Sequence, residues 1–422
     1  MASLRLWLEF LPIGGTKTVN MKVATFADIQ EALKNIAGVR RLTPCRLSES
    51  CSSRANTEVF LKFENMQKTG SYKIRGATNK FHHLSEEEKR NGVIASSAGN
   101  HAQGVAYAAS TLNIPAKIVM PLNAPIVKVL ATRGYGAEVI QHGDIYDEAY
   151  FHAKELAKQN HYTFIPPFED PYIIAGQGTT AIEIMEQVEN LDAIIVPVGG
   201  GGLICGIALA VKKIKPSIKV IGVQAENVSN IAKSFQAKDL VQDEVKQRTL
   251  ADGIAVKKPS PYMLDNYFHP YVDAMYTVSE SEMADAMVFL LERSKTVVEA
   301  SAAASVALAF REGKSFGSRI CCVLTGGNVD LNILSKVIEK GLIKRGRIFP
   351  LKLVMADVPG SLSQVTKVIA DHRANILEVY HDRIEQSLGP NQTMIEILVE
   401  TFDADHIAEI KGSLNKIGAT IL

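Results

Sequence analysis

The sequence contains little that would direct the protein to a membrane or to a polyanion. No apolar run among its 422 residues is long enough to span a bilayer, which excludes a protein built from membrane-spanning helices. The formal net charge is only +1, so the chain lacks the basic excess that attracts polyanions. We therefore expect neither a membrane nor nucleic acid among its partners.

The five cysteines form neither a Cys-x-x-Cys pair nor the spacing of a metal site. Cys321 and Cys322 are adjacent in the apolar run RICCVLTGG, which is typical of a buried strand. Cysteines used in this way suit a reducing compartment. We expect a cytoplasmic protein.

The only tryptophan, Trp7, lies in the first 20 residues, MASLRLWLEFLPIGGTKTVN. Glu9 interrupts the short apolar patch there and no small-residue cleavage site follows, which argues against a signal peptide. We expect residues 1–20 to be a disordered or extra segment, with Met21 as the working start.

What the sequence does have is the profile of a soluble globular protein, with 46% apolar and 22% charged residues. Its length exceeds one ordinary core and predicts two or three domains. Several segments share one order: a β-branched apolar run, a glycine-rich turn and a helical pattern. One has a strand over Val93–Ser96 and a helix from about His101, and another places Pro125 in the first turn of a helix. This order predicts an α/β fold with two parallel-sheet domains and ligands at the carboxyl ends of the strands.

The pattern changes after the basic linker Lys344–Arg347, which is a candidate domain boundary. The last stretch, 349–422, predicts a ferredoxin-like βαββαβ module. Its expected elements are, in order, strand Leu351–Met355, helix Ser361–His372, strand Asn375–Asp382, strand Met394–Thr401, helix Ala404–Ile417 and a short last strand.

A run of four glycines, Gly199, Gly200, Gly201 and Gly202, follows one predicted strand and opens a helix. Backbone N–H groups free of side chains can converge there on an anion at the positive end of the helix. The spacing matches neither a dinucleotide fingerprint nor a Walker loop, so a smaller phosphorylated cofactor is favoured. The alternative is a merely flexible loop.

A second junction of this kind reads SSAGNH, from Ser96 to His101. It offers backbone amides, a hydroxyl and a side-chain amide, which suit a substrate carboxylate and a polar ring substituent. The alternative is an ordinary helix cap made by Asn100.

The stretch KTGSYKIRGA places Lys73 close to a second cation, Arg75. A lysine is a nucleophile only when neutral, and burial or a neighbouring cation lowers its pKa. A lysine, a phosphate cradle and a carboxylate site together suggest pyridoxal phosphate, which forms a Schiff base with a lysine. Thr325 follows the strand CCVL and is placed like a hydroxyl partner for the pyridine nitrogen, although a strand-end threonine is otherwise ordinary.

Six stretches of the chain resemble, in order, motifs of the threonine ammonia-lyases (threonine dehydratases), which are pyridoxal-phosphate enzymes of the tryptophan synthase β fold type. The stretches are LKFENMQKTGSYKIRGA, SSAGNHAQGVA, AGQGTTAIEI, VPVGGGGLICGIA, LADGIAV and LTGGNVDL. The resemblance runs from about Ile36 to Leu334. It implies a catalytic region over 21–345, with a small domain of about 75–165 inserted in a large one.

The resemblance also implies a role for each matching residue. Lys73 would bind the cofactor covalently, Asn100 would meet its ring oxygen and Thr325 its ring nitrogen. The other implied cofactor contacts are Tyr72, Gly199, Gly200, Gly201, Gly202, Leu203 and Glu299. The residues implied to hold the amino-acid substrate are Ser97, Ala98, Gly99, Asn100 and His101.

At some positions the sequence differs from related families, and these differences indicate which reaction the chain would catalyse. The β-replacement enzymes resemble Ser-x-Lys-Asp-Arg, whereas here Ile74 precedes Arg75, which favours elimination. Serine racemases carry a serine that acts as an acid or base where this chain has Ala98. Ala98 cannot move a proton, so efficient racemisation is not expected.

Glu299 is present, but it is followed by Ala300–Ala302 in place of the usual Gly-Ala-Gly. A cation near Gln224–Glu226 and Ala251–Asp252 would fit the racemase ligand spacing only poorly, so we assign no metal.

The reaction implied by the resemblance is α,β-elimination of L-threonine to 2-oxobutanoate and ammonia, with L-serine also accepted. Lys73 would serve as both covalent anchor and general base. Two alternatives remain: a serine dehydratase or serine racemase on the same scaffold, and a non-catalytic amino-acid sensor.

The tail LKLVMADVPGSLSQVTKVIADHRANILEVYHDR resembles an ACT domain, a small-ligand sensor of amino-acid enzymes. The resemblance implies that Asp357, Pro359, Gly360 and Asn375 flank an amino acid at an interface between domains. A branched-chain amino acid or a nucleotide is the expected effector, and a purely structural dimerisation module is the alternative. A homodimer or homotetramer is the default assembly.

Overall fold

The structure is a computed structural model that describes residues 22–245, 247–385 and 388–422. The segment 1–20, expected to be disordered or extra, lies outside these ranges. No helix within them has the length and apolar character needed to cross a membrane.

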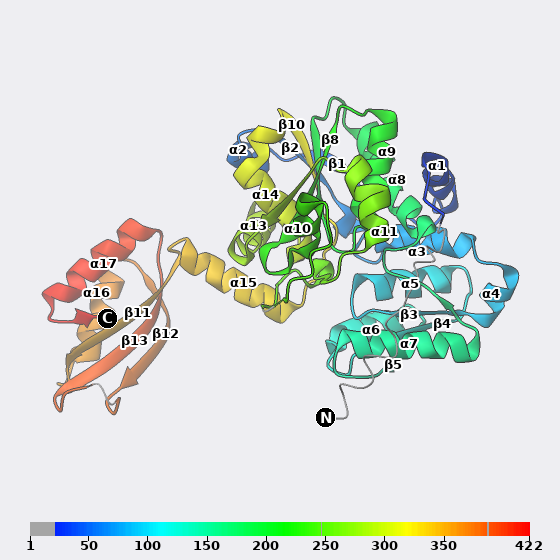
Figure 1. The fold of residues 1–422 in the computed structure, drawn as a ribbon. Helices are drawn as coiled ribbons and strands as arrows, with labels where there is room; N and C mark the ends of the chain where they lie inside the picture. Colours follow the sequence, from blue (N-terminus) through cyan, green and yellow to red (C-terminus); the bar gives the residue numbers. More distant parts are fainter. Residues whose placement is uncertain (1–21, 246, 386–387) are drawn as a thin grey trace.

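Six strands of the described chain form one sheet, the large sheet (Figure 1). All neighbouring strands are parallel except the edge strand β1, which is antiparallel to β2. Across the sheet the order is β1 (Cys45–Leu47), β2 (Glu58–Lys62), β10 (Arg319–Val323), β7 (Ala193–Pro197), β8 (Lys219–Ala225) and β9 (Ala274–Val278). The carboxyl ends of β2, β7 and β10 therefore meet at one edge.

Consecutive residues of the central strands face two different apolar layers. On β10, Cys321 belongs to one layer and Cys322 to the other, and both side chains are fully buried. The first layer includes the helices α1 (Phe26–Asn35), α8 (Pro171–Gln187) and α9 (Gly202–Ile214), and the second includes α2 (Glu49–Ala55), α13 (Glu280–Arg293) and α14 (Ala300–Phe316). Burial on both faces explains why these strands read as continuous apolar runs.

A second, all-parallel sheet lies beside the large one, with the order β5 (Glu138–Gln141), β4 (Ala116–Met120), β3 (Val93–Ser96) and β6 (Thr163–Phe164). The strand predicted over Val93–Ser96 is confirmed. Pro125, expected inside a first helical turn, is instead the N-cap, because α6 begins one residue later. The remaining helices of this part of the chain are α3 (Lys73–His82), α4 (Glu86–Asn91), α5 (Asn100–Thr111), α6 (Ile126–Gly134) and α7 (Tyr146–Asn160), and α10 (Asn230–Ala237) follows β8.

The C-terminal part folds as βαββαβ, and the predicted fold class is confirmed. Its antiparallel sheet has the order β12 (Asn375–Asp382), β13 (Gln392–Glu400), β11 (Ile348–Ala356) and β14 (Thr420–Ile421). Helices α16 (Ser361–Asp371) and α17 (Ala404–Lys416) pack on one face of this sheet. β11 starts before the predicted Leu351, because Ile348 and Phe349 continue the ladder with β13.

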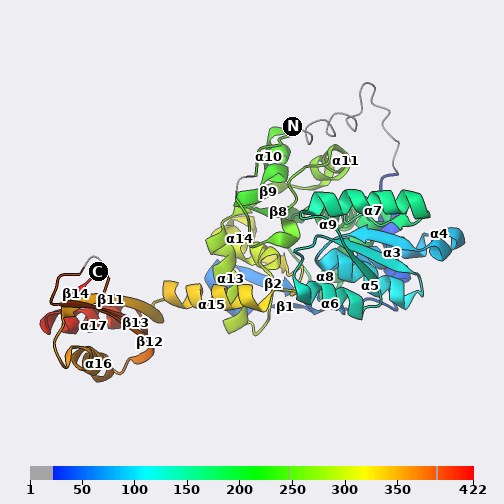
Figure 2. The same cartoon turned by 90° about the horizontal axis from the view of Figure 1, so that it is seen from below.

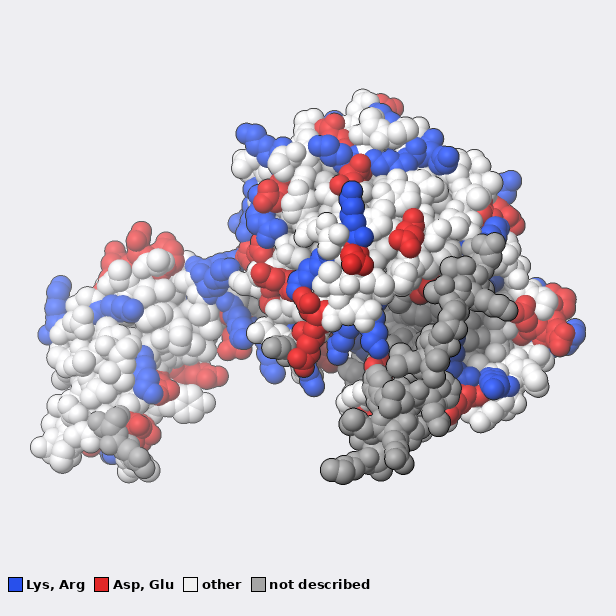
Figure 3. Space-filling model, in the orientation of Figure 1, with Lys and Arg blue, Asp and Glu red and all other residues white. Residues whose placement is uncertain are grey.

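Helix α15 (Leu331–Lys344) connects the two parts, and Figures 1 and 2 show it reaching out from the larger body to the C-terminal sheet. The basic linker after it is bound to α13: Arg345 Nη1 lies 2.7 Å and Arg347 Nη1 3.0 Å from carboxylate oxygens of Glu292. On the face drawn in Figure 3, cations and anions are interspersed over both parts. The expected limits of 21–345, 75–165 and 349–422 stay predictions.

Helices α3 and α8 touch backbone to backbone. A Cβ atom added to Gly176 would lie 2.6 Å from the Cα atom of Gly76 and 2.7 Å from the carbonyl oxygen of Arg75. Only glycine permits this approach, and it presses the helix that begins at Lys73 onto the first helix layer of the large sheet.

We expect Gly176→Ala to lower the free energy of unfolding by about 1–3 kcal/mol, because the backbone of α3 must shift to admit the methyl group. Urea unfolding followed by fluorescence would measure the change. Gly412→Ala is the control: this glycine lies in α17 with nothing within 4 Å of its added Cβ. The control should be neutral or stabilising by up to about 1 kcal/mol. Equal effects of the two substitutions would contradict the close-contact argument.

Candidate active site

Two segments far apart in the sequence are paired beside Lys73. Ser71 and Gly326 form an isolated antiparallel bridge. The backbone N–H of Tyr72 donates to the carbonyl of Thr325 at 3.1 Å, and that of Gly327 donates to the carbonyl of Gly70 at 2.9 Å. The start of α3 is thereby held against the carboxyl end of β10.

The amine of Lys73 is held inside the protein. Its Nζ atom donates to the carbonyl oxygen of Pro167 at 2.8 Å and lies 5.3 Å from the centre of the Tyr72 ring. Burial lowers the pKa of Lys73 to about 8, although the Glu299 carboxylate acts in the opposite direction. A substantial fraction of this amine is therefore neutral near physiological pH.

The expectation that Arg75 lowers this pKa is wrong. The Arg75 guanidinium points into a buried cluster where the carboxylates of Glu64 and Glu183 bind it. Its charge is compensated there, so burial is what lowers the pKa of Lys73.

Asn100 connects three parts of the site. Its Nδ2 atom donates to both carboxylate oxygens of Glu299 at 2.9 Å, and its Oδ1 atom accepts from Asn328 Nδ2 at 2.8 Å. The N-cap of α5 is Gly99, and Asn100 is the first helical residue. The interpretation of Asn100 as an ordinary helix cap is therefore wrong.

The Ser97–His101 turn lies at the carboxyl end of β3 and the start of α5. Ser97 Oγ accepts from the backbone N–H of Gly99 at 3.2 Å. The His101 side chain turns away and binds the carbonyl of Ile165 at 3.0 Å. Burial lowers the pKa of His101 to about 3, so its ring is neutral and donates to that carbonyl.

The four glycines occupy the junction between β7 and α9. Gly201 is the helix N-cap with φ +95°, and no side chain caps the first N–H groups of α9. A Cβ on Gly200 would lie 2.2 Å from the ring of Phe168, and one on Gly201 would lie 2.5 Å from the ring of Phe268. The interpretation as a merely flexible loop is therefore wrong: packing as well as backbone conformation requires glycine here.

Several buried hydroxyl groups near these residues have no hydrogen-bond partner among the described residues. They belong to Thr69, Ser71, Ser96, Ser301 and Thr325, each of which is at most 3% exposed. Leaving a buried hydroxyl without a partner costs free energy, so such groups point to a ligand. A hydroxyl at the end of β10, a buried lysine and open backbone N–H groups at the α9 start fit the ring nitrogen, aldehyde and phosphate of pyridoxal phosphate.

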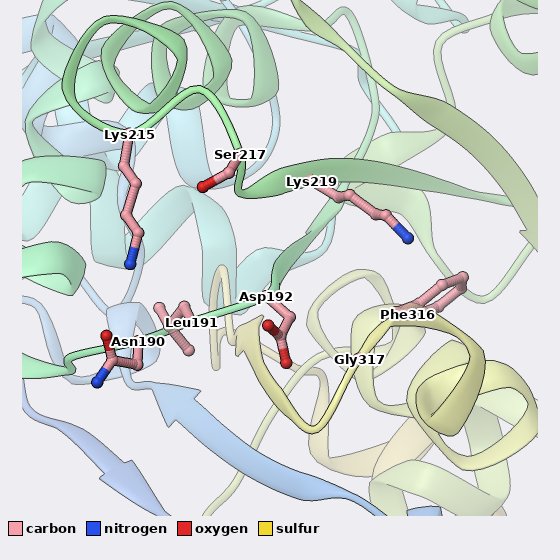
Figure 4. Close-up of a pocket in the computed structure, with 8 residues that line it drawn as sticks. All are labelled: Asn190, Leu191, Asp192, Lys215, Ser217, Lys219, Phe316 and Gly317. Carbon is pink, nitrogen blue, oxygen red and sulfur yellow. The ribbon is translucent and has the colours of Figure 1, made fainter.

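The cavity drawn in Figure 4 lies elsewhere. It has a volume of about 480 Å³ and is lined by Asp192, Lys219 and Gly317, among others, at the amino ends of β7, β8 and β10. This is the sheet edge opposite the glycine run. Across the three described ranges, no group of three or more His, Cys, Asp or Glu side chains gathers to hold a metal.

The fold and these residues define a class of enzyme. Residues 36–326 match the family model described as "Pyridoxal-phosphate dependent enzyme", and residues 351–419 match the ACT domain. This chain belongs to the family of pyridoxal-phosphate-dependent enzymes, and it carries a C-terminal ACT domain.

Individual members of this family are similar to the chain over most of its length. The L-threonine ammonia-lyase of Thermotoga maritima is 45% identical over 387 residues, which cover 92% of this chain and 96% of that protein. The structure of processed threonine deaminase isoform 2 from Solanum lycopersicum is 35% identical with a TM-score of 0.71, and the match covers 78% of this chain and 93% of that one. Maize serine racemase is equally similar, at 35% identity and a TM-score of 0.71, covering 76% and 99% of the two chains.

The residues expected to flank an effector in the ACT domain are not all brought together. Asp357, Pro359 and Gly360 lie between β11 and α16, where Gly360 is the N-cap with φ +96°. Asn375 starts β12 opposite Glu400, at the other end of the sheet from Asp357. A single ACT domain therefore cannot place all four around one small ligand.

Among the neighbours of the site that sequence reasoning missed are Pro167, Phe168 and Asn328. Asn328 stood in the motif LTGGNVDL, three residues after Thr325, and could have been noticed there. The other two lie in the loop between β6 and α8, and nothing in their local sequence indicates contact with Lys73 or the glycine run.

The carboxyl group of Glu299 leads to a pH prediction. Burial, followed by the negative charge of Asp252, raises the pKa of Glu299 to about 7, against 4.5 ordinarily. The folded state thus binds more protons than the unfolded chain between these values. This contribution to stability is complete below about pH 4.5 and is lost as the pH rises through about 7.

In the Glu299→Gln variant the side chain is neutral at every pH, so we expect the free energy of unfolding not to show this loss as the pH rises. In the cofactor-free protein, the free energy of unfolding of the wild type should fall relative to the variant by up to about 3 kcal/mol between about pH 5 and about pH 8. Urea unfolding at both pH values would measure it. Parallel pH dependences of wild type and variant would contradict a raised pKa.

Proposed function

We propose that this protein is an L-threonine ammonia-lyase that converts L-threonine to 2-oxobutanoate and ammonia and also accepts L-serine. The observation that carries the proposal is the meeting of Lys73, Thr325 and the glycine run at one edge of the large sheet. The match to the Thermotoga maritima relative with that name covers 92% of the chain.

Lys73 would act twice. Its Nζ atom would anchor the cofactor and, once released by the substrate amine, would remove the proton from the substrate α-carbon. The pKa of about 8 supports both roles, because the amine has to be neutral to attack or to accept a proton. The carbonyl of Pro167, now 2.8 Å from Nζ, would hold the amine in place between these steps.

The cofactor would be held by residues from four segments: Tyr72 beside its ring, Asn100 at the ring oxygen, Thr325 at the ring nitrogen, and Gly199–Gly202 with Leu203 at the phosphate. When bound, pyridoxal phosphate takes up the negative charge left by the removed α-proton. The Thr325 hydroxyl cannot keep the ring nitrogen protonated as a carboxylate would. A hydroxyl partner at this position would therefore favour elimination of the substrate β-hydroxyl.

The substrate carboxylate would be bound by the backbone N–H groups of the turn from Ser97 to His101, at the start of α5. Glu299 would act through Asn100, whose amide it orients.

We expect Lys73→Ala to lower kcat/KM for L-threonine by at least about 1,000-fold, because it removes both the anchor and the base. Lys68→Ala is the matched control, since Lys68 is an exposed lysine of the same stretch. Keto-acid formation and the visible absorbance of the purified proteins would be measured. A colourless wild type, or a Lys73→Ala variant as active as the control, would contradict the proposal.

The second candidate is a serine dehydratase or racemase, favoured by the similarity to the maize enzyme. Ala98 argues against racemisation, because its methyl group cannot deliver a proton to the second face of the substrate. A chiral assay on L-serine separates the racemase from both eliminating enzymes, which should give pyruvate and no accumulation of D-serine, and the ratio of kcat/KM for L-threonine to that for L-serine separates the ammonia-lyase from the dehydratase. Substantial D-serine would favour the racemase.

For the ACT domain we propose that isoleucine or valine binds as a feedback effector, at an interface that combines Asp357, Pro359 and Gly360 of one ACT domain with Asn375 of another. The separation of these residues within one chain supports a shared site, and so a homodimer or homotetramer. A cytoplasmic location is supported by five buried cysteines, all of them free.

We expect calorimetric titration of the full-length protein with isoleucine or valine to release heat, and Asp357→Ala to weaken this binding. AMP and glycine would be titrated in parallel as comparison ligands. Absence of heat with every branched-chain amino acid would contradict the effector proposal and favour a purely structural ACT domain.

A further inference from the structure

A buried cluster of charges lies directly behind Lys73. Lys62, Glu64, Arg75 and Glu183 are each at most 1% exposed. Arg75 belongs to the first turn of α3, two residues after Lys73, and no step of the reaction outlined above uses it.

The Arg75 guanidinium uses all five of its N–H groups. Nε and Nη2 donate to Glu64 at 2.7 and 2.8 Å, while Nη1 and Nη2 donate to Glu183, both at 2.7 Å. The fifth bond goes from Nη1 to Thr179 Oγ1 at 3.1 Å. A planar fork bound on all sides fixes both position and direction, which the point charge of a lysine cannot do.

These bonds join three elements. Glu64 lies in the short helix η1 (Glu64–Met66) directly after β2, and Glu183 lies in α8, whereas Arg75 is on α3. On the other side of α3, a Cβ on Gly104 of α5 would lie 3.1 Å from the backbone carbonyl carbon of Lys73. The first turn of α3 is thus held between α5 and the charge cluster.

Lys62 belongs to the same charge cluster, but it is not one of the residues that join α3 to η1 and α8. Its Nζ atom donates to Glu183 and to the carbonyl of Thr43, both at 2.7 Å, and it lies 4.0 Å from Glu64. Without Lys62, Glu183 would keep two cationic partners, Arg75 and Arg40. Lys62 therefore contributes charge and stability, whereas Arg75 also sets the place of α3.

We propose that Arg75 is a positioning residue, whose guanidinium fork sets the position and direction of the Lys73 amine relative to Thr325 and the glycine run. Buried ion pairs contribute little net stability compared with apolar packing. Net stability therefore does not explain why every N–H donor of Arg75 is used. The fixed geometry that these bonds give to the first turn of α3 explains it better. The inference rests on the proposed role of Lys73.

The test compares Arg75→Lys with Lys62→Met in the full-length protein with pyridoxal phosphate bound. Arg75→Lys keeps the charge and loses the fork. We expect kcat to fall by about 10- to 100-fold, since a misplacement of about 1 Å costs on the order of 100-fold. The pH midpoint of the visible absorbance band should also shift, because the environment of the Lys73 nitrogen changes.

Lys62→Met should lower the melting temperature while leaving the absorbance midpoint unchanged and kcat within about twofold of the wild type. If both variants lose activity in proportion to their loss in melting temperature, or if Arg75→Lys leaves the absorbance midpoint unchanged, the proposal is overturned.

Should Arg75→Lys fail to fold, Glu64→Gln loosens the fork from its other side and is expected to shift the same midpoint. An unchanged midpoint in that variant would also overturn the proposal. A wild type that carries no cofactor on Lys73 after borohydride reduction and mass analysis would refute the proposed function. A labelled wild type with an unaffected Arg75→Lys variant would refute the positioning role alone.

Discussion

The short antiparallel contact between Ser71 and Gly326 is the constraint on which the site depends. The two segments lie at opposite ends of the catalytic sequence, and neither forms a strand of its own. Their pairing brings the first residue of α3 beside the end of β10, where the Thr325 hydroxyl has no partner among the described residues. The bridge is antiparallel, whereas β2 and β10 pair in parallel up to Lys62 and Val323, so it is a separate contact beyond the last regular pair of these strands. The site is thus held at the carboxyl edge of the large sheet by a contact outside the regular ladder.

Two kinds of buried polar group lie in this region, and they differ in how many hydrogen-bond or ion-pair partners they have. The charges around Arg75 are fully paired, so removing any partner would leave an uncompensated ion in the interior. The groups proposed to contact the cofactor are less completely satisfied: the pKa of Lys73 is lowered, that of Glu299 is raised, and the hydroxyl of Thr325 has no described partner. The first set gives rigidity, and the second carries an energetic penalty that a bound ligand would relieve.

The sequence was sufficient for the architecture because each signal is local. The apolar run around Cys321 and Cys322 predicts a strand buried on both faces, and the glycines after β7 predict a strand-to-helix junction; both are confirmed. Local signals could not show where a side chain points after its turn, so the contact of the His101 ring with the carbonyl of Ile165 was not expected. They also could not show contacts between distant segments. Phe168 against Gly200 and the carboxylate partners of Arg75 become visible only in three dimensions.

The opposite orientations of Cys321 and Cys322 have a practical consequence. The two thiols are neighbours in the chain, yet one is covered by the layer of α8 and α9 and the other by the layer of α13 and α14. A thiol reagent can reach each of them only when its own layer opens. The ratio of their alkylation rates would therefore show which helix layer opens more often. Both cysteines would be found in a single proteolytic fragment.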